Sequence, residues 1–254
     1  MKGFQAELEA VEAGLRCISA SGNDKDIQFQ VDGGVEKGNW CDLRTHSCGC
    51  CCFVRQAARK LRELLSTHRE QLIQHVLERN WVPLLLDWLK LYQRPAVQVR
   101  GEGGPRYSKC HVVVHYRARP LIRCQVEALW ALTNIAAGAV ENTQVLIKHG
   151  AIPTLVSLLG SINEEVLEQA MWVLGNLAGE GTASRDAVLG DNAFCPIIRC
   201  LQRTHSSLSL LRIGSWTLSN LCDGQPRPAV DIHLALPVLT KLLQSGLSSP
   251  IPQS

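Results

Sequence analysis

The sequence predicts an all-α protein built as a solenoid of helical repeats. A tryptophan followed four residues later by an asparagine recurs three times in nearly the same surroundings, as Trp130/Asn134, Trp172/Asn176 and Trp216/Asn220. The tryptophans lie 42 and 44 residues apart, the period of a solenoid of two- or three-helix repeats. The chain has 254 residues, 46% of them hydrophobic and only 5% aromatic, enough for several repeats with a continuous core.

Residues 126–245 show the expected unit most clearly. The segments Glu141–His149 and Ala151–Leu159 are predicted as two short helices and Asn163–Gly179 as a long third one, with proline near a helix start and glycine at the ends. The same order returns in the segments Ser184–Gly190, Ala193–Arg203 and Ser206–Cys222. A further round begins with Val230–Leu234 and Leu236–Gln244. Pro250 and Pro252 exclude a third helix in the irregular tail 246–254.

Earlier repeats are expected within residues 5–98. Gln71–Glu78 and Trp81–Lys90 would supply the first two helices of the unit whose third helix carries Trp130. Ala6–Ala20 and Ala57–Ser66 are typical of the end of a still earlier unit. The chain is therefore predicted to hold about four repeats, the first and last incomplete.

Helix geometry predicts that the tryptophans face a ligand. At about 100° per residue, Asn134 lies near 40° from Trp130, so the pair shares one face. The apolar residues of this helix lie on the opposite face, between about 140° and 260°, and the other two copies divide in the same way. Because a separate apolar face already exists, the tryptophan–asparagine face is predicted to be exposed.

The repeats resemble armadillo repeats, and their motifs resemble the cargo-binding part of importin α, the nuclear-import adaptor. The residues that carry the resemblance are QVEALWALTNIAAG, AIPTLVSLLGS, EQAMWVLGNLAGEG and SWTLSNLCDG. The resemblance is strong over residues 126–245 and weaker but still detectable over 57–98. It implies that the repeats form a right-handed superhelix. It also implies a shortened member that keeps the repeats of the main cargo site, acts in cytoplasm and nucleus, and uses no cofactor, metal or catalytic residue.

The resemblance implies a site for lysine-rich nuclear localisation signals bound as extended chains. Trp130, Trp172 and Trp216 would flank lysine stems, while Asn134, Asn176 and Asn220 would bind the peptide backbone. A lysine stem packs on indole, and its ammonium gains cation–π attraction of about 0.5–2 kcal/mol. Gly138, Thr143 and Glu180 would form one deep lysine pocket, with Gln169 beside Trp172 on the same face.

Three positions depart from the family pattern. Glu180 stands where aspartate is usual, Ile213 replaces an asparagine, and Asp223 stands where arginine is common. Residues 126–245 hold seven Lys/Arg against ten Asp/Glu, a net charge of −3 that favours basic ligands. The sequence before Gln5 has no counterpart of the arginine-rich arm that binds importin β in this family, and neither nucleic acid nor a membrane is an expected partner.

Two segments, 31–56 and 99–125, interrupt amphipathic helices and are expected to be irregular. Each begins with valine after glutamine and ends with glutamine, as translation of an in-frame retained intron can produce. Retained introns and genuine insertions are both compatible with these two segments. The second segment carries a net charge of +5, which a solvated loop, a nucleic-acid site or a segment occupying the acidic groove would each explain.

The segments also hold seven of the eleven cysteines: Cys41, Cys48, Cys50, Cys51, Cys52, Cys110 and Cys124. Cys48 and Cys51, with His46 and Cys41 nearby, could ligate zinc, but the spacing is irregular and no second pair follows. Another armadillo scaffold for protein–protein interaction, a mis-spliced fragment unable to support import, and an enzyme are the competing hypotheses. The sequence has neither a nucleophile-elbow nor a phosphate-loop motif, so an enzyme is not expected.

Overall fold

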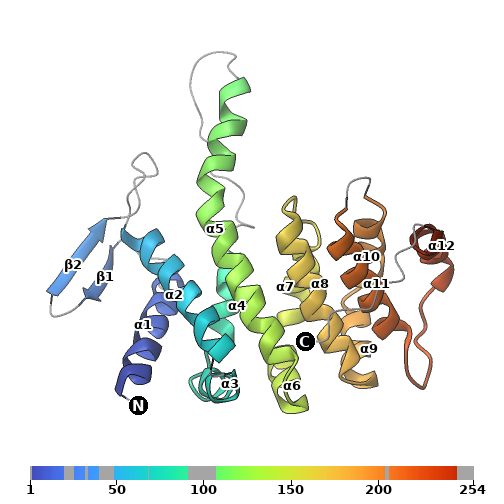
Figure 1. Cartoon of the computed structure of the whole chain (residues 1–254), viewed down its shortest axis with the longest axis horizontal. Helices are drawn as coiled ribbons and strands as arrows, with labels where there is room; N and C mark the ends of the chain where they lie inside the picture. The colour runs from blue at the N-terminus through green and yellow to red at the C-terminus, as the bar shows by residue number, and fades with distance from the viewer. Residues whose placement is uncertain are drawn as a thin grey trace. The chain divides into compact units, whose positions relative to one another are not determined.

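The structure is a computed structural model that describes residues 2–19, 26–31, 34–39, 49–67, 69–90, 107–203 and 206–244. It divides into two compact units, Met1–Ala128 and Leu129–Ser254. Helices dominate both units (Figure 1), which confirms the predicted all-α repeat fold.

Unit 1 is formed by α1 (Lys2–Ser19), α2 (Gly49–Thr67), α3 (Arg69–Glu78), α4 (Val82–Lys90) and the first part of α5 (Tyr107–Ala136). Helix α1 packs on α2 and α4, so its apolar face is covered on two sides. Leu8, Leu61, Trp81 and Trp88 are each no more than 2% exposed. Their burial makes this region a core rather than a surface for ligands.

A β-hairpin is an addition to the predicted all-α fold. Strands β1 (Asp26–Val31) and β2 (Gly34–Asn39) pair antiparallel, with Phe29 opposite Glu36. Apolar residues alternate with polar ones along β1, a period-2 pattern that favours a strand over a helix. The Asp–Gly sequence between the strands favours a tight hairpin turn.

The expectation that 99–125 is irregular was wrong for most of the segment. Helix α5 begins at Tyr107, so residues 107–125 continue the helix that carries Trp130. Cys124 and Gln125 are buried, and the Gln125 amide donates to the Leu89 carbonyl oxygen at 2.7 Å. Similarly, α2 begins at Gly49, within the first segment.

Unit 2 begins with the last part of α5 and continues with two three-helix repeats and the start of a third. Its remaining elements are α6 (Val140–Lys148), α7 (Ala151–Leu158), α8 (Glu164–Gly179), α9 (Thr182–Gly190), α10 (Phe194–Leu201), α11 (Leu208–Cys222), the 3-10 turn η2 (Ile232–Leu234) and α12 (Leu236–Gln244). Asn163 caps α8 by accepting from the Val166 N–H at 3.0 Å, and Ser207 caps α11 in the same way from Leu210. Side-chain caps of this kind fix where the two long helices begin.

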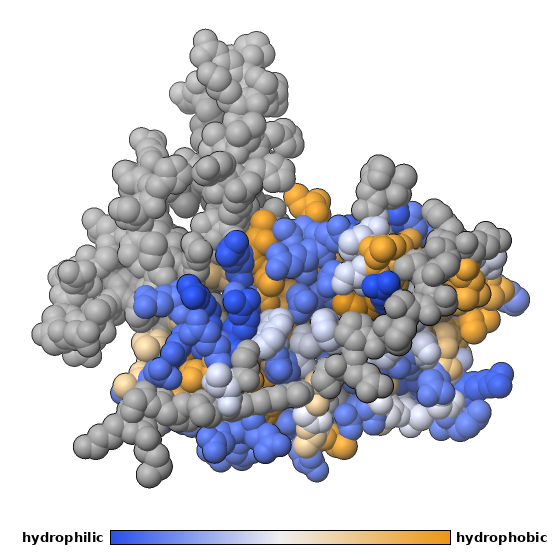
Figure 2. All heavy atoms as spheres, in the orientation of Figure 1, coloured by the Kyte–Doolittle hydropathy of each residue, from blue (hydrophilic) through white to orange (hydrophobic). Residues whose placement is uncertain are grey.

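Helix α8 packs on α11 along the length of both helices. Leu174 and Leu177 of α8 and Leu221 of α11 are fully buried, while Leu218 is 2% exposed. At the α12 end of unit 2, by contrast, Figure 2 shows hydrophobic surface, contributed by Ile232, Leu234, Leu236 and Leu243. Among the described residues, no helix combines the length and apolar character needed to cross a membrane.

Candidate functional site

The three tryptophan–asparagine pairs lie on the third helices of successive repeats, α5, α8 and α11. We call each pair a rung, and the six residues Trp130, Asn134, Trp172, Asn176, Trp216 and Asn220 the ladder. The helix faces opposite the rungs are buried, as the periodicity predicts. The six ladder side chains are half-buried rather than fully exposed. The prediction of an exposed face therefore holds only in part, because each rung also packs within the protein.

Asparagine side chains connect one rung to the helix before it. The Nδ2 atom of Asn176 on α8 donates to the Thr133 carbonyl oxygen of α5 at 3.2 Å. The Nδ2 atom of Asn220 on α11 donates to the Gly175 carbonyl oxygen of α8 at 2.9 Å. Asn134 instead donates to the Trp130 carbonyl oxygen of its own helix, at 2.9 Å. An amide carries two N–H donors and one oxygen acceptor, so Asn176 and Asn220 keep one donor and the oxygen available for a ligand.

A second contact between α8 and α11 was not predicted from the sequence. Thr217 is fully buried, and its hydroxyl contacts the Met171 carbonyl oxygen at 3.1 Å and that of Ile213 at 2.9 Å. Beside it, the indole of Trp216 lies directly over Gly175. The one signal in the sequence was a glycine in the interior of a helix, where glycine is unfavourable.

The residues predicted for the deep lysine pocket differ in accessibility. Gly138 is exposed, and Glu180 is half-buried at the C-terminal cap of α8, with no ion pair to any described residue. Thr143 is fully buried, with its hydroxyl donating to the Ala136 carbonyl oxygen at 3.4 Å. The Thr143 side chain is therefore turned toward the end of α5, and its place in a deep lysine pocket stays a prediction.

Gln169, predicted to lie beside Trp172, supplies an unused acceptor. Its side-chain oxygen is buried and has no hydrogen-bond partner among the described residues. A buried acceptor without a donor is unfavourable by roughly 1–3 kcal/mol, so this oxygen favours a ligand that brings an N–H group. Of the other two departures from the family pattern, Ile213 on α11 is buried in the core, and Asp223, the C-cap residue after α11, is exposed.

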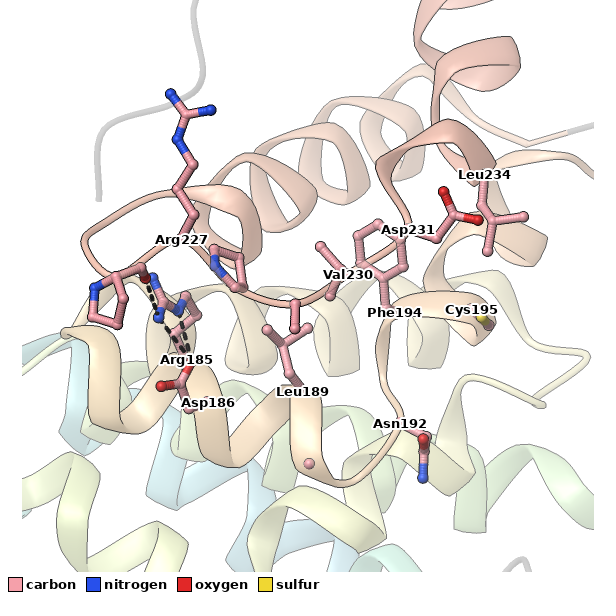
Figure 3. A pocket seen from close by; sticks show the side chains of 14 residues that line it. Arg185, Asp186, Leu189, Asn192, Phe194, Cys195, Arg227, Val230, Asp231 and Leu234 are labelled. Atoms are coloured by element: carbon pink, nitrogen blue, oxygen red, sulfur yellow. Dashed lines mark hydrogen bonds and ion pairs between the residues drawn. The ribbon is translucent and has the colours of Figure 1, made fainter.

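A separate hollow of about 580 Å³ lies between α9, α10 and the segment that follows α11 (Figure 3). None of its lining residues belongs to the three ladder helices. The Arg185 side chain at its edge is 2% exposed and donates to the Asp223 and Pro226 carbonyl oxygens and to the Asp186 carboxylate. Because this guanidinium is already satisfied within the protein, the hollow offers no buried free cation to an anionic ligand.

No group of side chains in the described part of the chain is arranged to hold a metal ion. The candidate zinc ligands Cys41, His46 and Cys48 lie outside the described residues. Cys200 is buried, which raises the pKa of its thiol and makes it a weak nucleophile.

Comparison with known proteins agrees with the repeat architecture. The Armadillo/beta-catenin-like repeat family model matches residues 140–179. Importin subunit alpha-2 of Arabidopsis thaliana is 39% identical over 209 residues, covering 82% of this chain and 32% of that protein. Importin subunit alpha-6 of the same plant is 48% identical over 136 residues, covering 53% of this chain and 25% of that protein. Importin subunit alpha-1b of Oryza sativa subsp. japonica is 36% identical over 191 residues, covering 75% of this chain and 30% of that protein.

The chain thus spans a quarter to a third of the length of these relatives, none of which is named as an enzyme. A solved structure of an engineered protein, 21% identical, matches with a TM-score of 0.53 over 82% of this chain and 72% of the other. That likeness shows the fold alone.

Proposed function

Because the chain belongs to the importin α family, we propose that it binds lysine-rich nuclear localisation signals of cargo proteins along the ladder. The peptide lies extended across α5, α8 and α11, and the chain acts as an adaptor in nuclear protein import, in cytoplasm and nucleus. Importin β is a partner proposed for the family as a whole, and no described residue is assigned to it.

The observation that supports this proposal most strongly is the repeated rung. In two successive repeats the asparagine donates one amide N–H to the preceding helix, so both asparagines are held in the same orientation. Each keeps an oxygen and a second N–H, the groups that an extended peptide backbone needs. Packed helices lie about 8–10 Å apart and an extended chain advances about 3.3 Å per residue, so one rung corresponds to roughly three peptide residues.

The unpaired groups around the rungs favour basic side chains. Glu180 has no cation partner among the described residues, and the Gln169 oxygen has no donor. An ammonium supplies both a positive charge and N–H donors, while its four-carbon stem packs on indole. A lysine side chain therefore complements this surface better than an acidic or a neutral one.

The test is titration of the chain with a fluorescent lysine-rich peptide and with the same peptide carrying alanine at every lysine. We expect binding of the first and none of the second. Exchanging Trp172 and Asn176 together for alanine should abolish binding and leave the circular dichroism spectrum helical. The control is Gln202→Ala, because Gln202 is an exposed amide off the ladder.

Two results would contradict the proposal. Equal affinity for both peptides would show that lysine is not recognised. Loss of helical structure in the double variant, with Gln202→Ala unaffected, would show that the second rung is needed for folding rather than exposed to a ligand.

A further inference from the structure

Helix α8 carries two glycines four residues apart, Gly175 in its interior and Gly179 at its last position. Glycine is the least favourable residue in a helix apart from proline, because it loses the most backbone freedom on folding. Four residues apart means one helix face, and both glycines lie toward α11. An unfavourable residue used twice on one face requires a reason in the packing.

The third rung occupies the space that side chains at these positions would need. A Cβ atom on Gly175 would overlap Cζ3 of Trp216 and approach both its Cε3 and the Thr217 hydroxyl oxygen to 2.8 Å. A Cβ atom on Gly179 would approach the Asn220 amide nitrogen to 2.8 Å. Neither distance is compatible with ordinary van der Waals contact, so Trp216 and Asn220 reach their positions only over bare backbone.

The same helix holds Asn220 by a second interaction. The Gly175 carbonyl oxygen accepts from the Asn220 amide at 2.9 Å, so the residue beneath the indole also binds the amide of the same rung. In the preceding repeat, the positions equivalent to Gly175 and Gly179 are Thr133 on α5 and Ala137 just after its end, and both residues have a Cβ. The pair of glycines is therefore particular to the helix beneath the third rung.

We infer that Gly175 and Gly179 are positioning residues of the peptide site, which hold Trp216 and Asn220 against α8. Through this contact they fix the gap between the indoles of Trp172 and Trp216, where a lysine stem lies. This inference rests on the proposed function for its ligand, but the contact itself is independent of it. The inference means that two glycines without any contact to the peptide contribute to how tightly the third rung binds it.

The principal test is Gly175→Ala, with Gly190→Ala as the matched control. Gly190 is also helical, and a Cβ there meets nothing within 4 Å. Alanine has a higher helix propensity than glycine at both positions. A loss of stability or affinity in Gly175→Ala therefore cannot come from helix propensity. We expect the labelled lysine-rich peptide to bind Gly175→Ala about tenfold more weakly, and Gly190→Ala within about twofold of the unmodified chain.

A spectroscopic measurement follows the indole without any peptide. With 5-fluorotryptophan incorporated and the Trp216 resonance assigned from Trp216→Phe, Gly175→Ala should shift that ¹⁹F resonance and Gly190→Ala should not. A merely structural glycine would change stability and leave this resonance in place. If Gly175→Ala does not fold, Gly179→Ala replaces it, because the Asn220 side chain it meets is able to move.

The two proposals fail in distinguishable ways. If the unmodified chain does not bind the lysine-rich peptide, the proposed function is refuted. The ¹⁹F shift still decides whether Trp216 is held against Gly175. If Gly175→Ala leaves both the peptide affinity and the Trp216 resonance unchanged, the positioning role of the glycines is refuted and the proposed function is not affected. A double-mutant cycle with Trp216→Ala completes the test: the effect of Gly175→Ala on unfolding should become smaller once the indole is gone, leaving the part due to the Thr217 hydroxyl.

Discussion

At the residue scale, the asparagines of the ladder have a part in the fold as well as in the proposed site. The sequence allowed Asn176 and Asn220 to be identified, because both follow a tryptophan at one-turn spacing. It did not indicate that their amides donate to carbonyl oxygens of the preceding helix, since those acceptors are 43 and 45 residues away in the chain.

Replacing Asn220 by alanine should lower the free energy of unfolding by about 1 kcal/mol, since one partly buried hydrogen bond to a carbonyl is lost. Urea denaturation followed by circular dichroism measures this change. Gln202→Ala removes an amide of similar size from an exposed position and should change stability little. Equal stabilities of the two variants would show that the bond to α8 contributes nothing to folding.

Glu180 is expected to supply charge to the lysine pocket. Glu180→Gln keeps the size of the side chain and removes its charge, so a lysine-rich peptide should bind about 10- to 100-fold more weakly at low salt, and the salt dependence should flatten. Glu165→Gln is the control, because Glu165 is an exposed acid at the opposite end of α8. Unchanged affinity of Glu180→Gln at low salt would identify Glu180 as an ordinary solvated acid.

At the element scale, the sequence predicted most helices of unit 2 closely, and it failed where a helix continues into an inserted segment. Periodicity and the caps at Asn163 and Ser207 mark α8 and α11. No equivalent signal marks the start of α5 at Tyr107, because the basic segment lacks a clear apolar period and contains Pro120. Its helical continuation depends on the attached amphipathic part rather than on its own residues.

Deleting residues 99–125 should raise the free energy of unfolding. The deletion places Val97 where Cys124 is buried, and Gln98 where Gln125 donates to the Leu89 carbonyl oxygen. The buried contacts are thereby preserved, and a shorter connection between α4 and α5 costs less entropy to close, a gain of roughly 1 kcal/mol. Calorimetry of both chains measures the difference.

The control for this deletion is the same chain carrying Gln98→Ala, which should lose the gain because the Leu89 carbonyl oxygen is left without its donor. A deleted chain that melts below the full chain would show that the segment is a genuine, stabilising part of the protein. Transcripts that retain the segment in every tissue would agree with that result.

At the scale of the whole molecule, the repeat period alone predicted the architecture, because each repeat buries its apolar face only against its neighbours. The hairpin in unit 1 was not predicted, since a short alternating segment is ambiguous until its pairing partner is known. The last described helices leave apolar side chains uncovered at the α12 end, with Leu243 81% and Leu236 46% exposed.

Exchanging Leu236 and Leu243 together for lysine should reduce self-association of the chain at high concentration, because contiguous apolar surface favours contact between molecules. Sedimentation velocity over a range of concentrations measures the effect. Leu208→Lys, at an exposed leucine at the start of α11, should leave the association unchanged. An association that persists in the double variant would place the contact elsewhere.

The bond from Asn220 to α8 also bears on how such chains change in length during evolution. Its acceptor is the main-chain oxygen of Gly175, a group that every residue possesses. A duplicated or lost repeat would therefore present an acceptor for this amide on whichever third helix came next, and only the space under the Trp216 indole would still require a glycine there. Under the proposed function, the length of bound peptide would then change in whole-repeat steps of roughly three residues, while each remaining asparagine kept its orientation.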